Sequence, residues 1–277
     1  MLWARGALIR DGELSVSVLD RTFEHGLGLF ESFRTWNGHP TLLRRHLERL
    51  MTSARELGLP LEADQLPDPQ AVAELIDASR DVVPPGEDAR LRITLSGGLE
   101  TAPASGSLLW MSVGALPPPQ REPGIIISDS IEVVADDPLA RHKTLNYWRR
   151  RIAHSGANAA GSDEILCVTR DGRICEASRS NIFLVEGRRI VTPSLDCPLL
   201  PGIMRRVVLE QAGKAGLDVH ETSLQVERIK SADEAFLTNS VRGIVPIAQL
   251  MGVALRAPGR ITRELWEHVL TWLEAGG

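Results

Sequence analysis

The segment ALPPPQREPG, residues 115–124, constrains the fold of this chain more than any other stretch. It contains four prolines and shows no hydrophobic periodicity. Proline has no backbone N–H and a fixed φ, so this composition suits neither a helix interior nor a central strand. A chain of 277 residues is long enough for two domains. We therefore expect an N-terminal domain over residues 1–114, a linker over 115–124 and a C-terminal domain over 125–277.

Both sides of the linker mix helical and strand patterns, with apolar residues at helical spacing in some segments and β-branched runs between turn residues in others. The expected elements before the linker are helices over 42–59 and 69–83 and strands over 89–98 and 106–116. Those after it are strands within 124–134, 164–193 and 233–250, and helices over 144–161, 201–217 and 261–275. The pattern predicts a mixed α/β fold in each domain.

Composition argues against several functional classes. The net charge is −5, and arginine groups such as 149–151 are scattered without interleaved aromatic residues, so we expect solvated surfaces and no nucleic-acid partner. No run of ~18 apolar residues predicts a membrane span, and the N-terminus lacks the apolar core of a signal peptide. Cys167, Cys175 and Cys197 cannot all pair and form no zinc pattern, so we expect no metal site and a reducing, cytoplasmic compartment.

Lysine is rare in this chain. Of 31 lysines and arginines only three are lysines, Lys143, Lys214 and Lys230, and the single tyrosine, Tyr147, lies four residues after the first. A deprotonated lysine can form a Schiff base with an aldehyde, whereas arginine stays protonated. Lys214 and Lys230 lie among polar and charged residues, but Lys143 precedes a mixed polar and aromatic stretch. A surface charge is the ordinary alternative for any lysine.

Several motifs in order resemble one known family. These are LDRTFEHGLGLFESFRTWNGHPTLLRRHLERL (19–50), HKTLNYW (142–148), DEILCVTRDGRICEASRSNIFLV (163–185), TPSLDCPLLPGIMRR (192–206) and FLTNSVRGIVPI (236–247). Together they resemble the class IV aminotransferases, the fold-type IV pyridoxal-phosphate enzymes. The family includes branched-chain and D-amino-acid aminotransferases and 4-amino-4-deoxychorismate lyases. The resemblance implies a two-domain α/β fold, pyridoxal 5'-phosphate at the domain interface and a homodimer.

The same resemblance implies roles for individual residues. Lys143 would carry the cofactor as an internal aldimine and then act as the base that moves the α-proton. Glu176 would meet the pyridine nitrogen and keep it protonated. Tyr147 would lie near the phenolic oxygen. From the residues alone, an exposed strand residue is the favoured interpretation of Glu176, and a core residue with its hydroxyl bonded elsewhere is an alternative for Tyr147.

Binding of the phosphate is implied for three places. Arg49 would offer a forked cation, the start of the helix at Ile203 would offer backbone N–H groups, and the turn at Asn239 and Ser240 would add further donors. An exposed surface charge is the alternative for Arg49, because the chain is rich in arginine.

The motifs that bind the substrate carboxylate depart from the family pattern. Neither the Arg-Pro of branched-chain enzymes nor the Arg-x-His of D-amino-acid enzymes occurs around residues 90–105, which leaves Arg92 as the candidate. Gly26-Leu27-Gly28 replaces a common Gly-Asp-Gly and bears on pocket shape. The glycine-rich segment of the lyases is replaced by SGGLETAPASG (96–106), although Asn239 is lyase-like.

We therefore expect an aminotransferase that moves an amino group between a small amino compound and a 2-oxo acid. The alternative is 4-amino-4-deoxychorismate lyase, which eliminates pyruvate to give 4-aminobenzoate. A ligand-binding protein without catalysis is disfavoured, because such a protein would be expected to lose Lys143 or Glu176, and both are present.

Overall fold

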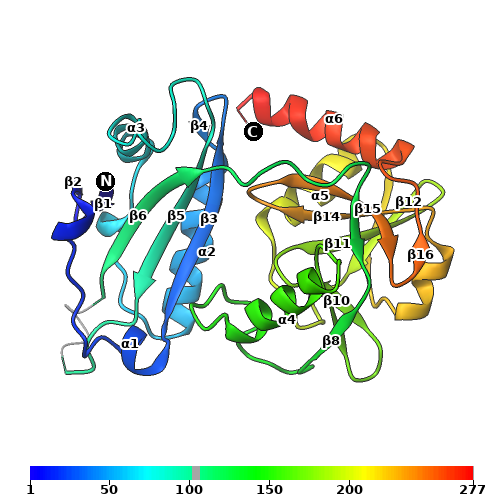
Figure 1. Ribbon diagram of the computed structural model, residues 1–277, viewed down its shortest axis with the longest axis horizontal. Coiled ribbons are helices and arrows are strands. Elements are labelled where there is room, and N and C mark those ends of the chain that lie inside the picture. The colour runs from blue at the N-terminus through cyan, green and yellow to red at the C-terminus, as the bar shows by residue number, and fades with distance from the viewer. Residues whose placement is uncertain (102–106, 277) are drawn as a thin grey trace. The chain divides into compact units, whose positions relative to one another are not determined.

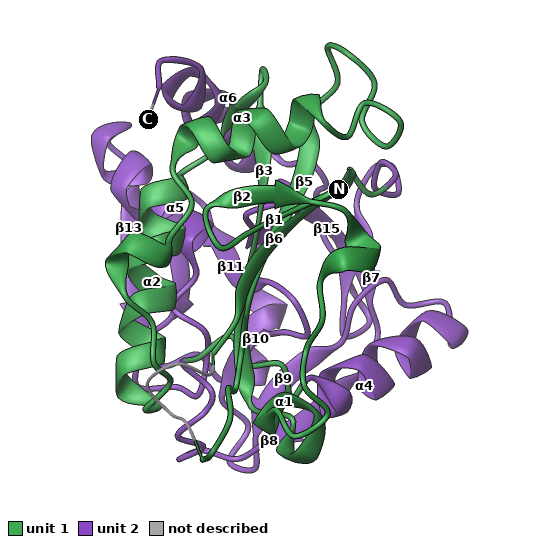
Figure 2. Cartoon of the chain, turned by 90° about the vertical axis from the view of Figure 1, so that its left-hand side faces the viewer, with its two compact units in different colours: residues 1–117, 142–146, 277 green, residues 118–141, 147–276 purple. Residues whose placement is uncertain are grey.

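The computed structural model describes residues 1–101 and 107–276 (Figure 1). Residues 102–106, part of the SGGLETAPASG segment, and Gly277 lie outside the described residues. The chain divides into two compact units (Figure 2). Unit 1 contains residues 1–117 and 142–146, and unit 2 contains residues 118–141 and 147–276. The division after residue 117 falls inside the expected linker, but residues 142–146, expected in the C-terminal domain, belong to unit 1.

Unit 1 is built on an antiparallel sheet, with strand order β2-β1-β6-β5-β3-β4 among the described residues. Its strands are β1 (Leu2–Ala4), β2 (Ala7–Ile9), β3 (Gly28–Trp36), β4 (His39–Pro40), β5 (Ala89–Ser96) and β6 (Leu109–Ala115). Buried residues alternate with more exposed ones over the first four residues of β5 and of β6, as expected for strands with one face on a core, and the last four residues of β5 are all buried. Phe33, Leu91 and Met111 are fully buried there.

The helices of unit 1 are α1 (Arg21–His25), α2 (Leu43–Glu56) and α3 (Pro69–Asp77), with 3₁₀ turns at Asp11–Glu13 and Ala63–Gln65. Helices α2 and α3 lie in segments predicted as helices, whereas α1 was not predicted and α3 ends at Asp77, before the expected end at 83. The Asp68 carboxylate accepts the Ala71 N–H at 2.8 Å, and Pro69 occupies the first helical position, which together fix the start of α3. Leu50 of α2 and Leu75 of α3 are buried in the same core as the sheet.

Strand β3 was not predicted, although it is the longest strand of the sheet. Its sequence, GLFESFRTW, does not alternate apolar and polar residues, because a charged residue, Glu31, takes an inward position and is only 1% exposed. A carboxylate at a buried position reads as a solvent-facing residue in any hydrophobicity pattern. The short strands β1, β2 and β4 were also missed.

Unit 2 contains two sheets. The larger has the order β13-β12-β11-β14-β15-β16, with β7 paired to β15, and the smaller has the order β10-β9-β8. The strands are β7 (Ile125–Ile127), β8 (Ser130–Val133), β9 (Leu166–Thr169), β10 (Ile174–Ala177), β11 (Asn181–Glu186), β12 (Arg189–Pro193), β13 (Asp218–Thr222), β14 (Glu234–Asn239), β15 (Gly243–Leu250) and β16 (Val253–Ala254). All but β13 and β16 lie in segments predicted as strands.

The helices of unit 2 are α4 (Trp148–Ala159), α5 (Ile203–Lys214) and α6 (Arg260–Glu274), and a 3₁₀ turn spans Val226–Ser231. The buried Glu234 carboxylate caps α6 by accepting the N–H groups of Ile261 and Thr262 at 3.0 and 2.8 Å. Helix α4 begins at Trp148 and not at 144, because residues 142–146 form part of unit 1.

Two features that would indicate other functions are absent from the described residues. No helix in residues 1–101 and 107–276 combines the length and the apolar character that crossing a membrane requires. Across the same ranges, no group of three or more His, Cys, Asp or Glu side chains is placed to hold a metal ion.

Candidate active site

The segment that carries Lys143 is paired with the start of β3. The Phe30 N–H donates to the Lys143 carbonyl at 2.9 Å, and the Leu145 N–H donates to the Gly28 carbonyl at 2.9 Å. Leu29 and Thr144 form an antiparallel bridge between these two bonds. The lysine backbone is therefore fixed to the sheet of unit 1 by regular strand hydrogen bonding.

Glycine at position 28 permits this close pairing. Gly28 has φ of +143°, a conformation that L side chains rarely adopt. A Cβ at this position would lie 2.6 Å from Leu145 Cδ1 and 2.7 Å from the Leu95 carbonyl oxygen. The glycine noted in the Gly26-Leu27-Gly28 motif thus allows residues 142–146 to lie against β3.

His142 attaches the same segment to α2. Its Nδ1 lies 3.0 Å from the Ser53 hydroxyl, and its Nε2 lies 3.7 Å from a Glu56 carboxylate oxygen. The residue before Lys143 is thus held by a helix, while Lys143 itself is paired to a strand. This double attachment limits the range of positions that the lysine amine can reach.

Two cationic side chains flank the Phe30 ring. The Lys143 amine lies 4.4 Å from the ring centre, and the guanidinium carbon of Arg92 lies 3.9 Å from it. Arg92 also donates from Nε to the Thr94 hydroxyl at 3.2 Å. Cation–π contact of this kind favours both charges at one ring. An anionic group of a substrate near Lys143 would therefore meet a second positive charge.

Behind Lys143 lies a buried triad that the sequence did not reveal. Glu31 accepts two bonds from Arg49, from Nε at 2.8 Å and from Nη2 at 2.7 Å, and His46 Nδ1 lies 2.7 Å from the same carboxylate. Burial opposes ionisation of Glu31, but the Arg49 charge and the His46 hydrogen bond outweigh it and lower its pKa to about 2. Glu31 is therefore an anion at all working pH values.

The charge of Lys143 acts on the pKa of His46, a member of this triad. Burial lowers the pKa of His46, and the positive charges of Arg49 and Lys143 lower it further against the opposing pull of Glu31. The Nε2 atom of His46 is buried and has no hydrogen-bond partner. Arg49, predicted to bind phosphate, thus has two of its five N–H donors fixed on Glu31, which sets the orientation of the guanidinium.

In unit 2, Glu176 lies in β10 and is 2% exposed. Its Oε2 accepts the Leu200 N–H at 3.2 Å, and its Oε1 pairs with Arg150 Nη2 at 2.5 Å. The alternative of an exposed strand residue is excluded for Glu176. The structure also corrects the expectation of a solvated face at 149–151, because Arg150 takes part in this ion pair.

Tyr147 immediately precedes α4, and its hydroxyl points to the Ser178 carbonyl oxygen at 3.5 Å, the limit of a hydrogen bond. Burial raises the pKa of Tyr147, Arg150 opposes this shift, and the negative charge of Glu176 adds to it. Tyr147 and Glu176 are therefore electrostatic neighbours within unit 2, which is consistent with one binding site for both.

The start of α5 offers backbone donors. Its first residue is Ile203, and Gly202 before it provides no side-chain cap, so the N–H groups of the first turn are unsatisfied within the helix. A Cβ at Gly202 would lie 1.9 Å from Asn181 Oδ1, so this position is closed to larger residues. Asn181 pairs with Thr238 on the next strand, and the buried Thr238 hydroxyl has no partner.

Asn239 shapes the adjacent turn instead of pointing its amide at a ligand. Its Oδ1 accepts the N–H groups of Val241 and Arg242 at 3.0 and 2.8 Å, and its Nδ2 donates to the Ser180 hydroxyl at 3.0 Å. This side chain fixes the backbone on both sides of Ser240. These bonds hold the turn, and the binding of the cofactor at Asn239 and Ser240 stays a prediction.

The residues present fit an aldehyde cofactor with a phosphate and a ring nitrogen. The described contacts gather Lys143, Arg92 and Arg49 around Phe30 and Glu31 in unit 1. They gather Tyr147 and Glu176 in unit 2, where the α5 start and the unpaired Thr238 hydroxyl also lie. Each unit offers part of the donor set that a phosphorylated pyridine aldehyde requires: unit 1 a lysine amine, and unit 2 a buried carboxylate and unsatisfied helix N–H groups.

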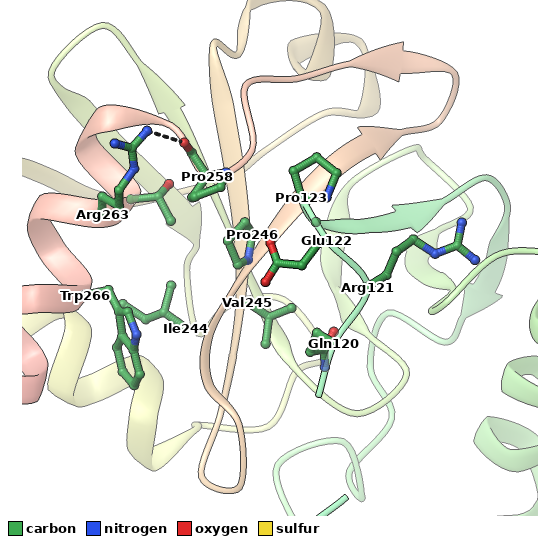
Figure 3. Close-up of a pocket in the computed structure, with 12 residues that line it drawn as sticks. Gln120, Arg121, Glu122, Pro123, Ile244, Val245, Pro246, Pro258, Arg263 and Trp266 are labelled. Carbon is green, nitrogen blue, oxygen red and sulfur yellow. Dashed lines mark hydrogen bonds between the residues drawn. The ribbon is translucent and has the colours of Figure 1, made fainter. Parts of the chain in front are cut away.

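A separate pocket in unit 2 does not contain these groups. It measures about 200 Å³ and is lined by the chain around Gln120–Gly124, by β15 and by the start of α6 (Figure 3). Arg263 on its rim donates to the Pro258 carbonyl at 3.0 Å, as the dashed line in Figure 3 marks. None of the predicted site residues lines this pocket, so it is not the candidate site.

Comparison with known proteins defines the class. The sequence signature of the family described as amino-transferase class IV matches residues 28–250. The chain belongs to this family, whose members are pyridoxal-phosphate enzymes. The resemblance found in the motifs and the fold class that it implied are thus confirmed.

Individual relatives include both transaminases and a lyase. The chain is 29% identical over 277 residues to a putative branched-chain-amino-acid aminotransferase of Methanocaldococcus jannaschii, covering 96% of this chain and 94% of that one. It is 28% identical over 260 residues to the aminodeoxychorismate lyase of Bacillus subtilis, with 90% and 86% covered. The structure of the branched-chain aminotransferase of Thermoproteus uzoniensis with norvaline matches with a TM-score of 0.84, 26% identity and 99% and 96% coverage.

We predict that Gly28→Ala displaces residues 142–146 from β3 and weakens the binding of pyridoxal phosphate by about tenfold or more. The added methyl would meet Leu145 and a backbone carbonyl, and overpacking of this kind costs about 1–3 kcal/mol. Titration of the purified variant with pyridoxal phosphate, followed by absorbance, measures the effect.

Gly26→Ala is the matched control. Gly26 also has positive φ, +70°, but its added Cβ would have no atom within 4 Å. Gly26→Ala should therefore lose about 1 kcal/mol of stability to backbone strain and should keep its affinity for the cofactor. Equal cofactor affinity for Gly28→Ala and wild type would contradict the role assigned to this pairing.

Proposed function

We propose that the chain is a pyridoxal-phosphate aminotransferase that moves an amino group between a small amino compound and a 2-oxo acid, with Lys143 as its covalent and proton-moving residue. The observation that carries the proposal is the pairing of residues 142–146 with β3, which fixes Lys143 beside Phe30 and Arg92. Family membership and the buried carboxylate of Glu176 support it.

Each group has a distinct task in this proposal. Pyridoxal 5'-phosphate supplies the electron sink that stabilises negative charge at the reacting carbon. Lys143 would hold the aldehyde and, once its amine is released by substrate, would carry the proton from the α-carbon. Glu176 would accept the N–H of the ring nitrogen and keep that nitrogen charged. Tyr147, with its pKa raised, stays protonated and donates to the phenolic oxygen.

For the phosphate we infer three contributors: the Arg49 guanidinium, the backbone N–H groups at Ile203 and the turn that holds Asn239 and Ser240. Arg49→Lys keeps a positive charge beside Glu31 but loses the fork, so phosphate-dependent affinity should fall. Arg44→Lys is the control, because Arg44 makes only an exposed pair with Glu48. Comparing pyridoxal with pyridoxal phosphate in both variants tests the assignment, and an unchanged phosphate contribution in Arg49→Lys would refute it.

Arg92 is the proposed contact for the substrate carboxylate. Its guanidinium and the Lys143 amine flank the same ring, so a carboxylate that reaches Arg92 would carry its amino group toward Lys143. Arg92→Gln should raise KM for acidic donors far more than it lowers cofactor affinity. An equal loss of both would return Arg92 to a structural role.

We also infer a homodimer in a reducing, cytoplasmic compartment. Apolar side chains are exposed on each unit, with Val18, Leu19 and Phe23 exposed by 79%, 63% and 66%, and Trp148 and Ile152 of α4 by 74% and 64%. Exposed apolar groups at this density support an interface between copies. Three unpaired buried cysteines support the compartment. Sedimentation at micromolar concentration tests the dimer, and a monomer there would refute it.

We predict that borohydride reduction of the protein loaded with pyridoxal phosphate fixes the cofactor on Lys143. The lysine amine lies in the proposed site, whereas Lys214 and Lys230 lie elsewhere in the fold, at the end of α5 and in the 3₁₀ turn. Peptide mapping measures the label. Label on Lys214 or Lys230 would overturn the assignment, and Lys143→Arg should abolish it.

The second candidate reaction is elimination of pyruvate from 4-amino-4-deoxychorismate. The 28% identity to a lyase and the presence of Asn239 favour it. The two reactions differ in their need for an acceptor, because a transaminase leaves its cofactor as the amine after one half-reaction, whereas a lyase regenerates the aldehyde in every cycle.

We therefore predict that an amino donor alone bleaches the visible absorption of the holoenzyme once, and that a 2-oxo acid restores it. Stopped-flow absorbance with a panel of donors and acceptors provides the measurement. Sustained release of pyruvate from 4-amino-4-deoxychorismate, with no 2-oxo acid and no bleaching, would replace the transaminase with the lyase.

A further inference from the structure

Burial makes the ionised form of the Glu176 carboxyl group unfavourable. This residue is 2% exposed, and transfer of a carboxylate from water to such a place costs several kcal/mol unless a charge or several donors compensate. The Leu200 N–H donates to Oε2 at 3.2 Å, but this donor is neutral. The compensating charge comes from Arg150, whose Nη2 lies 2.5 Å from Oε1.

The second terminal nitrogen of the Arg150 guanidinium is also hydrogen-bonded. Arg150 lies in the first turn of α4, while Glu176 lies in β10 (Figure 1). Its Nη1 donates to the Ser178 carbonyl at 3.2 Å, and this carbonyl is the acceptor that the Tyr147 hydroxyl also approaches. Burial disfavours the charge of Arg150, but Glu176 outweighs that effect and raises the pKa of Arg150. Arg150 is therefore charged throughout the working range.

We propose that Arg150 is a positioning residue for Glu176: it keeps the buried carboxylate ionised and fixes the plane of its two oxygens before any ligand binds. The proposal rests on the proposed function, in which Glu176 meets the ring nitrogen of pyridoxal phosphate. It adds that the charge of Glu176 is shared, because a guanidinium on Oε1 draws electron density from the carboxylate. Arg150 thus sets how strongly Glu176 attracts the proton of the ring nitrogen.

Three titratable groups near Glu176 stay neutral between pH 5 and 9. Burial raises the pKa of Cys167 to about 12. The hydrogen bond to Cys197, together with burial, raises the pKa of Cys175, and burial raises the pKa of Tyr147. Cys197 does titrate in this range, because its hydrogen bond with Cys175 lowers its pKa to about 7, and His154 lies 3.4 Å from the Ser178 hydroxyl. Both residues are kept in the variant that replaces Glu176, so a pH effect that disappears in that variant is assigned to Glu176 itself.

The first arm of the test uses the protein without cofactor. Melting temperatures are measured from pH 5 to 9 for wild type, Arg150→Gln, Arg150→Lys, and Arg150→Gln combined with Glu176→Gln. Without the guanidinium, a buried carboxyl binds a proton more tightly in the folded than in the unfolded chain. That stabilisation is present at low pH and is lost as pH rises through the folded-state value.

Arg150→Gln should therefore lose melting temperature, relative to the double variant, as pH rises from 5 to 9. Arg150→Lys keeps a charge and should follow wild type. If Arg150→Gln does not fold by itself but the double variant does, this result also supports the proposal. Parallel profiles for Arg150→Gln and the double variant would overturn the proposal, because Arg150 would then not hold the charge of Glu176.

The second arm separates positioning from simple stability. In protein loaded with pyridoxal phosphate, the visible absorption due to the lysine-bound cofactor changes with pH. Removing the Arg150 charge leaves more negative charge beside the cofactor, which favours its protonated form, so the pH midpoint should rise by about one unit in Arg150→Gln. Arg150→Lys should restore it. An unchanged midpoint would also overturn the proposal, since a merely structural arginine would not move it.

The two arms separate this proposal from the proposed function. If wild type forms no covalent adduct with pyridoxal phosphate, the proposed function fails, and the positioning role that rests on it fails too. The cofactor-free melting profiles still decide whether Arg150 holds the Glu176 charge. If the adduct forms and either arm fails, only the assignment of Arg150 is lost.

Discussion

The antiparallel pairing of residues 142–146 with β3 is the constraint on which the site of unit 1 depends. Two backbone hydrogen bonds, from Phe30 to the Lys143 carbonyl and from Leu145 to the Gly28 carbonyl, hold a lysine that lies far along the sequence against the N-terminal sheet. Backbone bonds of this kind depend on close approach and not on side-chain identity, so the requirement falls on Gly28. The Lys143 amine is thus placed by a strand register, beside Phe30 and near Arg92.

The buried charges of the two units share one design. In unit 1, Glu31 is held by Arg49 and His46, and in unit 2, Glu176 is held by Arg150 and a backbone N–H. Breaking such a pair by removing one partner typically costs about 3–5 kcal/mol, because the other charge is left buried. Each arginine therefore compensates the charge of an interior carboxylate and fixes where that carboxylate points.

The sequence predicted most helices and the family, because amphipathic periodicity and ordered motifs are local signals. It could not predict β3, since Glu31 interrupts the apolar pattern where a non-local partner, Arg49, compensates the charge. It also mistook Arg150 for a solvated residue, because its neighbours in 149–151 are exposed and only the fold brings Glu176 to it. The side-chain role of Asn239 was likewise invisible, as a turn hydrogen bond leaves no trace in composition.

Amide hydrogen exchange of Leu145, followed by NMR in the protein without cofactor, tests the strand pairing most directly. Leu145 N–H should exchange as slowly as amides of the β3–β5 ladder such as Leu91, since it is bonded to a sheet carbonyl. Arg121 and Glu122, exposed residues in the region between β6 and β7, provide the fast reference. Exchange of Leu145 at the rate of Arg121 would contradict the account, because Lys143 would then lie on a segment that β3 does not hold.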